Sequence, residues 1–171
     1  MKTAFFYFFW ALLMSQTAFS QNPFITRWNL ATSGSGATQL SFGVATSGTV
    51  NYTWQEVAPG SAMGMGTFSG TTATITGLPA GAIIDLSIAP TNFQRINIFS
   101  GTDKSRLTDV KQWGDVAWTS METAFLGCNN LNITAIDVPN LSSVSSMRQM
   151  FRFCSSLNEI GRASCRERVS S

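Results

Sequence analysis

The sequence predicts a mainly β protein in which an Ig-like β-sandwich leads into a short solenoid, with a strand and a short helical turn in each repeat. Residues 24–99 alternate apolar with polar or small side chains, and segments rich in Gly, Ser and Thr separate the apolar runs. Near the C-terminus one motif occurs twice, displaced by 26 residues. A period between about 20 and 50 residues is typical of units that stack because none can bury its apolar face alone.

Residues 1–20 have the features of a secretory signal peptide. Lys2 precedes an apolar run from Phe5 to Met14, and Ala18 and Ser20 place small residues at the cleavage-defining positions. The apolar run is shorter than the roughly 20 residues that a membrane-spanning helix needs. We therefore expect cleavage after Ser20, no transmembrane segment in the mature chain, and a secreted or cell-surface location.

Residues 21–100 are predicted to form the sandwich, with about six strands where a complete one has about seven. The strands around Leu40–Val44 and Val50–Trp54 are expected to pair through a hairpin loop at 45–49. Further strands are expected at 72–76, from Ile84 to Ile88 and at 93–99. The glycine-rich stretch 60–70 lacks the lysine and the strand-to-helix context of a phosphate loop, so we expect a flexible loop there.

Residues 106–159 are predicted to hold about two repeats, the first preceded by a degenerate unit that begins at Leu107. Spacings of three and four residues place the apolar side chains of each repeat on one face of a short helical turn. Ile133, Ile136 and Val138 are the apolar residues of the extended segment that follows, which ends at Pro139. The residues that define the repeat are expected to be structural: Trp118, Met121, Phe125, Cys128, Leu131, Met147, Met150, Phe151, Cys154 and Leu157.

The two motif copies, from Trp113 to Leu131 and from Pro139 to Leu157, resemble the BspA-like leucine-rich repeat surface proteins of bacteria. The resemblance covers roughly residues 107–159. It implies a leucine-rich-repeat solenoid, exposure at the cell surface or secretion, and adhesion to host proteins or other bacteria. The chain departs from that family in length, because it shows about two repeats where the family usually has many.

The last twelve residues, 160–171, break the repeat abruptly, and the stretch from Ile160 to Val169 looks like a translated sequencing adapter. We expect these residues to be an artefact, so that the chain is the N-terminal fragment of a longer protein. With both ends set aside, seven basic and eight acidic side chains lie between Gln21 and Glu159. This balance gives no basic surface of the kind that binds nucleic acid.

No enzyme, metal or cofactor site is predicted. The chain contains no histidine, which excludes the Ser-His-Asp and Cys-His arrangements. Structural zinc sites normally use four Cys or His ligands, and only Cys128 and Cys154 lie outside the suspect tail that holds Cys165. The acids Asp103, Asp109 and Asp115 are expected to be solvated turn residues.

Two groups of side chains allow two interpretations each. Cys128 and Cys154 could form a disulfide between neighbouring coils or a ladder of buried thiols, and we favour the thiols because free cysteine packs as a small hydrophobe. Four tryptophans could form a contact surface or fill the core, and we favour the core: Trp28, Trp54, Trp113 and Trp118.

These observations predict a binding protein without an active site, whose ligand is an extracellular protein or a surface glycan. Adhesion to proteins or cells is the first hypothesis, since stacked repeats present long recognition surfaces. The alternatives are a non-catalytic accessory module that binds surface glycan, or the N-terminal part of a larger secreted protein. No residue can be assigned to a contact from the sequence.

Overall fold

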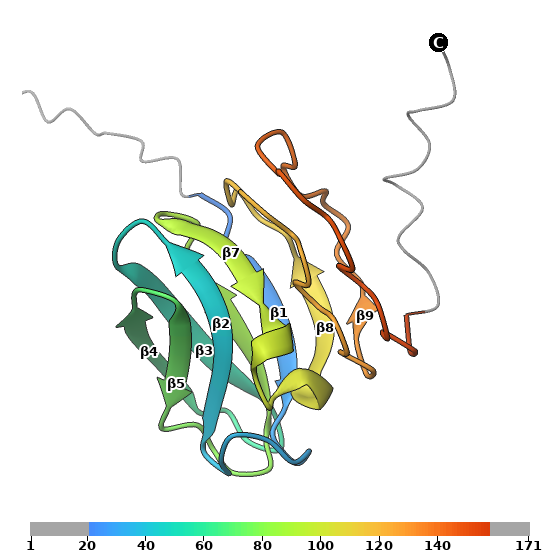
Figure 1. Cartoon of the computed structure of the whole chain (residues 1–171). Helices are drawn as coiled ribbons and strands as arrows, with labels where there is room; N and C mark the ends of the chain where they lie inside the picture. The colour runs from blue at the N-terminus through green and yellow to red at the C-terminus, as the bar shows by residue number, and fades with distance from the viewer. Residues whose placement is uncertain (1–20, 158–171) are drawn as a thin grey trace, which may run out of the picture.

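A computed structural model describes residues 21–157, and this part of the chain is mainly β, with two sheets and two short 3₁₀ helices (Figure 1). The predicted signal peptide and the suspected adapter tail lie outside the described residues. The elements are β1 (Phe24–Asn29), β2 (Gln39–Thr46), β3 (Val50–Ala58), β4 (Met63–Phe68), β5 (Thr72–Thr76), β6 (Ile83–Ile88), β7 (Phe93–Asn97), η1 (Ile98–Ser100), η2 (Lys104–Arg106), β8 (Leu107–Gln112) and β9 (Asn132–Ile133).

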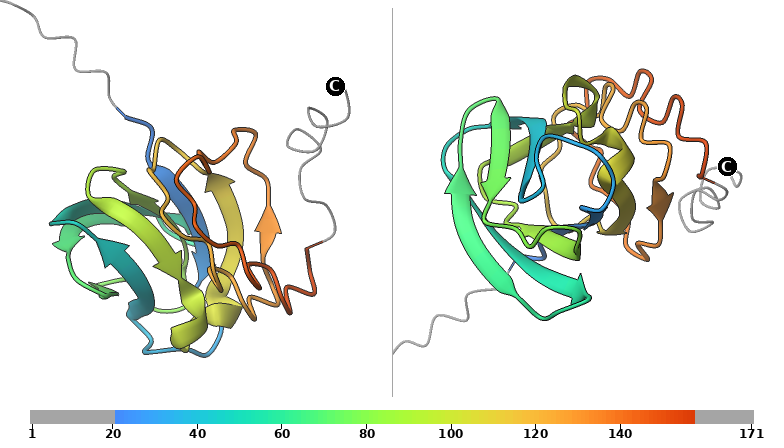
Figure 2. Two further views of the ribbon diagram at one scale, coloured as in Figure 1. Left: turned by 45° about the horizontal axis from the view of Figure 1, so that its top comes forward. Right: turned by 90° about the horizontal axis from the view of Figure 1, so that it is seen from below.

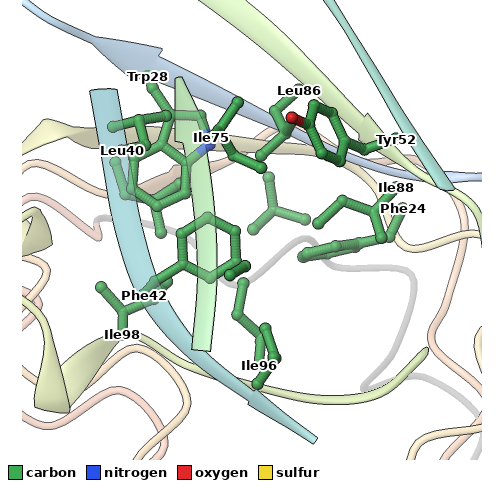
Figure 3. Close-up of a cluster of buried hydrophobic side chains, with 14 of the residues drawn as sticks. Phe24, Trp28, Leu40, Phe42, Tyr52, Ile75, Leu86, Ile88, Ile96 and Ile98 are labelled. Carbon is green, nitrogen blue, oxygen red and sulfur yellow. The ribbon is translucent and has the colours of Figure 1, made fainter. Parts of the chain in front are cut away.

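The two sheets enclose one hydrophobic core. The larger sheet has the strand order β4-β3-β6-β1-β8-β9, and the smaller sheet, β5-β2-β7, lies over it (Figure 1). Alternate residues of β1, β2, β3, β5 and β6 point between the sheets, as the sequence pattern predicts. Trp28 of β1 stacks on Phe42 of β2 with ring centroids 5.3 Å apart (Figure 3). The mainly β prediction is therefore confirmed.

The predicted pairing of Leu40–Val44 with Val50–Trp54 is wrong. Both segments are strands, but β2 pairs with β5 and β7, whereas β3 pairs with β4 and β6. Residues 47–49 therefore carry the chain from one sheet to the other. Both strands point their apolar residues into the shared core, and this alternation is the same for a hairpin and for a crossing between layers.

The glycine-rich stretch 60–70 is not a loop throughout, because it contains the edge strand β4. Gly64 and Gly66 lie opposite Trp54 and Tyr52 of β3, on the side that faces the core. The large rings of β3 fill the space that side chains at the two glycines would otherwise take. The methionines between the glycines, Met63 and Met65, point outward and are 74% and 81% exposed.

Replacing Gly64 by alanine is expected to lower the free energy of unfolding by about 1 to 3 kcal/mol, the usual cost of overpacking. A Cβ at this position would lie 2.7 Å from Cε2 of the buried Trp54 indole, which is closer than van der Waals contact. Urea unfolding followed by circular dichroism measures the change. Met65→Ala on the same strand is the control and should stay within about 0.5 kcal/mol. Equal stability of the two variants would show that the indole can move aside.

The segment that contains the sequence repeat runs alongside the sandwich as hydrogen-bonded stretches of chain (Figure 2). The backbone N–H groups of Met121 and Phe125 donate to the carbonyl groups of Ser146 and Met150, at 2.8 and 3.0 Å. On the other side, the N–H of Ile98 donates to the carbonyl of Ala124 at 2.8 Å. Backbone near β7, around Phe125 and around Phe151 therefore lies side by side.

The predicted helical turn of each repeat is instead a pair of tight turns. Hydrogen bonds join residues three apart, as from the N–H of Cys128 to the carbonyl of Phe125, at 3.0 Å. Thr123 and Gln149 have φ of 55° and 57°, and Gly127 and Phe153 have φ of 80° and 63°. These left-handed residues interrupt a right-handed helix at matching places in the two copies.

The extended segment after Leu131 is shorter than predicted. Strand β9 pairs in parallel with β8 over two residues, Asn132 and Ile133. Of its three apolar residues, Ile133 packs against the core, whereas Ile136 and Val138 are 95% and 56% exposed. Just after β9 the backbone N–H groups of Thr134 and Ala135 both donate to the carbonyl of Val110, at 3.1 and 3.0 Å, so the regular parallel pairing ends there. The side chain of Asp109 also accepts from the N–H of Thr134.

Candidate functional site

The predicted repeat-defining residues of the two motif copies pack against one another and against the core of the sandwich. In the first copy all five are fully buried: Trp118, Met121, Phe125, Cys128 and Leu131. In the second copy Met150 is buried, Met147 is half exposed, and the remaining residues are partly buried: Phe151, Cys154 and Leu157. Phe125 stacks on Phe151 with ring centroids 5.5 Å apart and ring planes 7° from parallel. These contacts supply packing, and they offer no ligand-binding group.

The four tryptophans for which a surface or a core position was considered are buried, which confirms the prediction that they belong to the core. Trp28 and Trp118 have no exposed surface, and Trp113 and Trp54 are 5% and 8% exposed. Trp118 lies edge-on to Phe24, Phe93 and Trp113 with centroids 5.1 to 6.4 Å apart. They therefore do not form a stacking platform at the surface.

Asp103 is not a solvated turn residue, because its side chain is fully buried in an ion pair with Arg106 at 3.1 Å. The Asp103 carboxylate accepts hydrogen bonds from the N–H and hydroxyl groups of Ser35 and from the N–H of Ser41. Arg106 donates to the carbonyl groups of Thr32, Gly36 and Gln39. The pair thus fastens the loop between β1 and β2 to the segment before β8.

Asp109 was also expected in solvent and is instead mostly buried, whereas Asp115 is exposed as predicted. Asp109 accepts hydrogen bonds from the N–H and hydroxyl of Thr134 at 2.9 and 2.7 Å. Asp137 binds the N–H groups of Trp113 and Gly114 in the same way. These acids connect β8 to the coil that contains β9, so their role is structural.

Cys128 and Cys154 are free thiols in this structure, which agrees with the thiol ladder rather than the disulfide. Cys128 is fully buried, and the thiol of Cys154 donates to the carbonyl of Phe125 at 3.1 Å. Burial raises the pKa of both thiols because the charged thiolate loses its hydration. A raised pKa removes the nucleophilic form at neutral pH.

Cys128 is expected to make stability fall as the pH rises above about 9. In the folded chain the raised pKa keeps this thiol protonated, while in the unfolded chain it ionises near its ordinary pKa of 9.0. The unfolded state then binds fewer protons, so each pH unit removes about 1.4 kcal/mol from the free energy of unfolding. Urea unfolding between pH 8 and 10 measures this slope. Cys128→Ala should show a shallower slope, and an unchanged slope would contradict the assignment.

The outer face of the six-stranded sheet contains a depression of about 500 Å³, lined by residues of β1, β3, β4 and β6. Strand register places eight outward side chains of this sheet face in two rows that cross the strands, and all of them except Arg27 line the depression. One row is Met65, Thr53, Ser87 and Ile25, and the other is Met63, Gln55, Asp85 and Arg27. We call these eight residues the sheet-face grid. Both rows begin at exposed methionines and continue through polar or charged side chains, and the first row ends at the apolar Ile25.

The charges of the sheet-face grid cancel. Arg27 donates to both carboxylate oxygens of Asp85, at 2.7 and 2.8 Å, and each side chain keeps about 30% of its surface exposed. The hydrogen bonds to Asp85 raise the pKa of Arg27, against the opposing effect of burial. Thr53, Gln55 and Ser87 make no side-chain hydrogen bond to another residue of the described chain. Their polar groups are therefore available to a ligand.

The sequence contains only part of the signal for this grid. Alternation along β3 and β6 marks Thr53, Gln55, Asp85 and Ser87 as the outward positions. Their position in common rows depends on strand pairing and register, which alternation does not specify. Because a loop was expected at 60–70, the sequence did not predict that Met63 and Met65 lie on a strand at this face.

Within residues 21–157, no cluster of three or more His, Cys, Asp or Glu side chains is arranged to hold a metal ion. No helix in the described part of the chain is long and apolar enough to span a membrane.

A family model described as "Mycoplasma protein of unknown function, DUF285" matches residues 93–162, which is less than half of the chain. The matched segment begins at β7, so it contains both the side-by-side coils and the strand of the sandwich to which they bond. Comparison with curated proteins and with solved structures finds no significant match. The family match hints at a bacterial surface-protein family, and it brings no separate support for the leucine-rich-repeat resemblance.

Proposed function

We propose that this chain is a secreted or cell-surface binding protein that acts by adhesion to an extracellular protein or a cell, without catalysing a reaction. The observation that carries the proposal is the exposure of large apolar side chains in residues 134–157, which we call the coil segment. Four large side chains there are at least half exposed: Ile136, Val138, Met147 and Phe153. Large apolar side chains left exposed on a protein surface are candidates for contact with a partner.

We also propose that the two sheets form an Ig-like sandwich and that the two motif copies form a short repeat solenoid. An Ig-like sandwich is supported by two facing sheets over one core. A short repeat solenoid is supported by backbone hydrogen bonds between residues 25 to 27 apart, and by left-handed residues at matching places of the two motif copies. The match to a family of mycoplasma proteins supports a bacterial surface role for this segment.

Binding of the purified chain to immobilised extracellular matrix proteins, and to intact epithelial and bacterial cells, tests this function. The informative variant is Ile136→Ser with Val138→Thr, which removes apolar surface from side chains that are 95% and 56% exposed. The matched control is Val57→Thr on the sandwich, which is 44% exposed. We expect at least tenfold weaker binding for the coil variant and unchanged binding for the control. Binding to none of these surfaces, or equal loss in both variants, would contradict the proposal.

A further inference from the structure

We propose that the sheet-face grid binds a neutral oligosaccharide, an inference that rests on the proposed binding function and names a ligand class for a second surface. The first argument is unused hydrogen-bonding capacity. Thr53, Gln55 and Ser87 together offer two hydroxyl groups and one amide, and none of them bonds within the described chain. A ligand that carries both donors and acceptors can pair with all three.

The second argument is charge. The bidentate pair of Arg27 and Asp85 leaves the grid with no net formal charge, so a charged ligand would have to be desolvated without a counter-ion. Within residues 21–157 the Asp85 carboxylate accepts two hydrogen bonds, both from Arg27, and its remaining lone pairs can accept from hydroxyl groups. A polyhydroxylated neutral molecule fits this set of groups.

The third argument is shape. Each row crosses four strands, which is about 14 Å at the usual strand spacing. The depression of about 500 Å³ lies within the range of small-ligand sites. Met63 and Met65 close one end of the rows with apolar, adaptable side chains that can pack against the C–H groups of a sugar ring. The lining combines an apolar surface, to which Ile25, Trp54 and the two methionines contribute, with the polar groups of Thr53, Gln55 and Ser87. A sugar ring presents the same combination of C–H and hydroxyl groups.

The test uses a variant that removes hydrogen-bonding groups while it keeps volume and strand propensity. Thr53→Val with Gln55→Met changes two exposed side chains that make no hydrogen bond within the described chain, so folding should be preserved. The matched control is Asn51→Thr, on the same strand and the same face but outside the lining of the depression. Circular dichroism and thermal unfolding verify that all three proteins fold alike.

An array of neutral, sialylated and sulfated oligosaccharides is the first probe, followed by calorimetric titration with the best neutral member. We expect binding to neutral oligosaccharides and about a tenfold weaker affinity in the double variant, because two or more hydrogen bonds are lost. The control should bind as the parent does. A blank array, binding of charged glycans alone, or neutral binding that the double variant leaves unchanged would overturn the inference. Adhesion that depends on Ile136 and Val138 would survive any of these results, so the two proposals fail separately.

Discussion

Asp103→Ala is expected to lower the free energy of unfolding by about 3 to 5 kcal/mol, the cost of removing one partner of a buried ion pair. The substitution leaves the Arg106 guanidinium, 3% exposed, without its carboxylate. It also leaves the N–H groups of Ser35 and Ser41 without acceptors. Small domains are stable by only about 5 to 15 kcal/mol, so this variant should lose a large part of its stability. Urea unfolding of the parent and variant measures the difference.

Asp115→Ala is the control, because Asp115 is exposed and its side chain makes one hydrogen bond within the described chain, accepting from the N–H of Asn22 at 2.7 Å. We expect a change within about 1 kcal/mol for this variant. Combining Asp103→Ala with Arg106→Met should recover part of the loss, since no unpaired charge then remains buried. An Asp103 variant no less stable than the control would show that the carboxylate is not essential to the loop between β1 and β2.

The burial of Asp103 could not be predicted from its neighbours in the sequence. The segment Ser100–Ser105 is polar and resembles a solvated turn, and nothing near it in the sequence indicates burial. Its hydrogen-bond partners, Ser35 and Ser41, lie more than 60 residues away. The burial of Asp103 is therefore a tertiary property, created where the loop after β1 folds over the start of β8.

The predicted alternation of side chains succeeded where one face of a strand meets the core, as in β2, β3 and β6. It could not distinguish a hairpin from a crossing between sheets, because both give the same pattern. It also missed β4, where Gly64 and Gly66 take two of the three inward positions and contribute no hydrophobic signal. There the packing information lies in the partner strand, in the rings of Trp54 and Tyr52.

The repeat was visible in the sequence, but its local conformation was not. Spacings of three and four residues arise in a helix and also in successive tight turns whose hydrogen bonds join residues three apart. The deciding residues are Thr123 and Gln149, which adopt positive φ although neither is glycine. Side-chain type gave no warning of this backbone conformation, because such residues favour negative φ elsewhere.

Trp118→Ala is expected to cost about 3 to 5 kcal/mol, as is usual for removing a fully buried aromatic side chain. Its ring contacts Phe24 of β1 and Phe93 of β7, so it joins the coil to both sheets of the sandwich. Because this contact is shared, the loss should appear as one cooperative transition at lower urea concentration. Circular dichroism and tryptophan fluorescence, followed together during urea unfolding, measure it.

Trp118→Phe separates packing from hydrogen bonding. The indole Nε1 of Trp118 is buried and has no hydrogen-bond partner within the described chain, so phenylalanine removes volume without removing a bond. We expect a smaller loss, of about 1 to 2 kcal/mol. Ile136→Ala, at a side chain that is 95% exposed, should change stability by less than about 0.5 kcal/mol. If Trp118→Ala gave two separate transitions, with the sandwich as stable as in the parent, the coil and the sandwich would be independent units, and the shared aromatic core would not couple them.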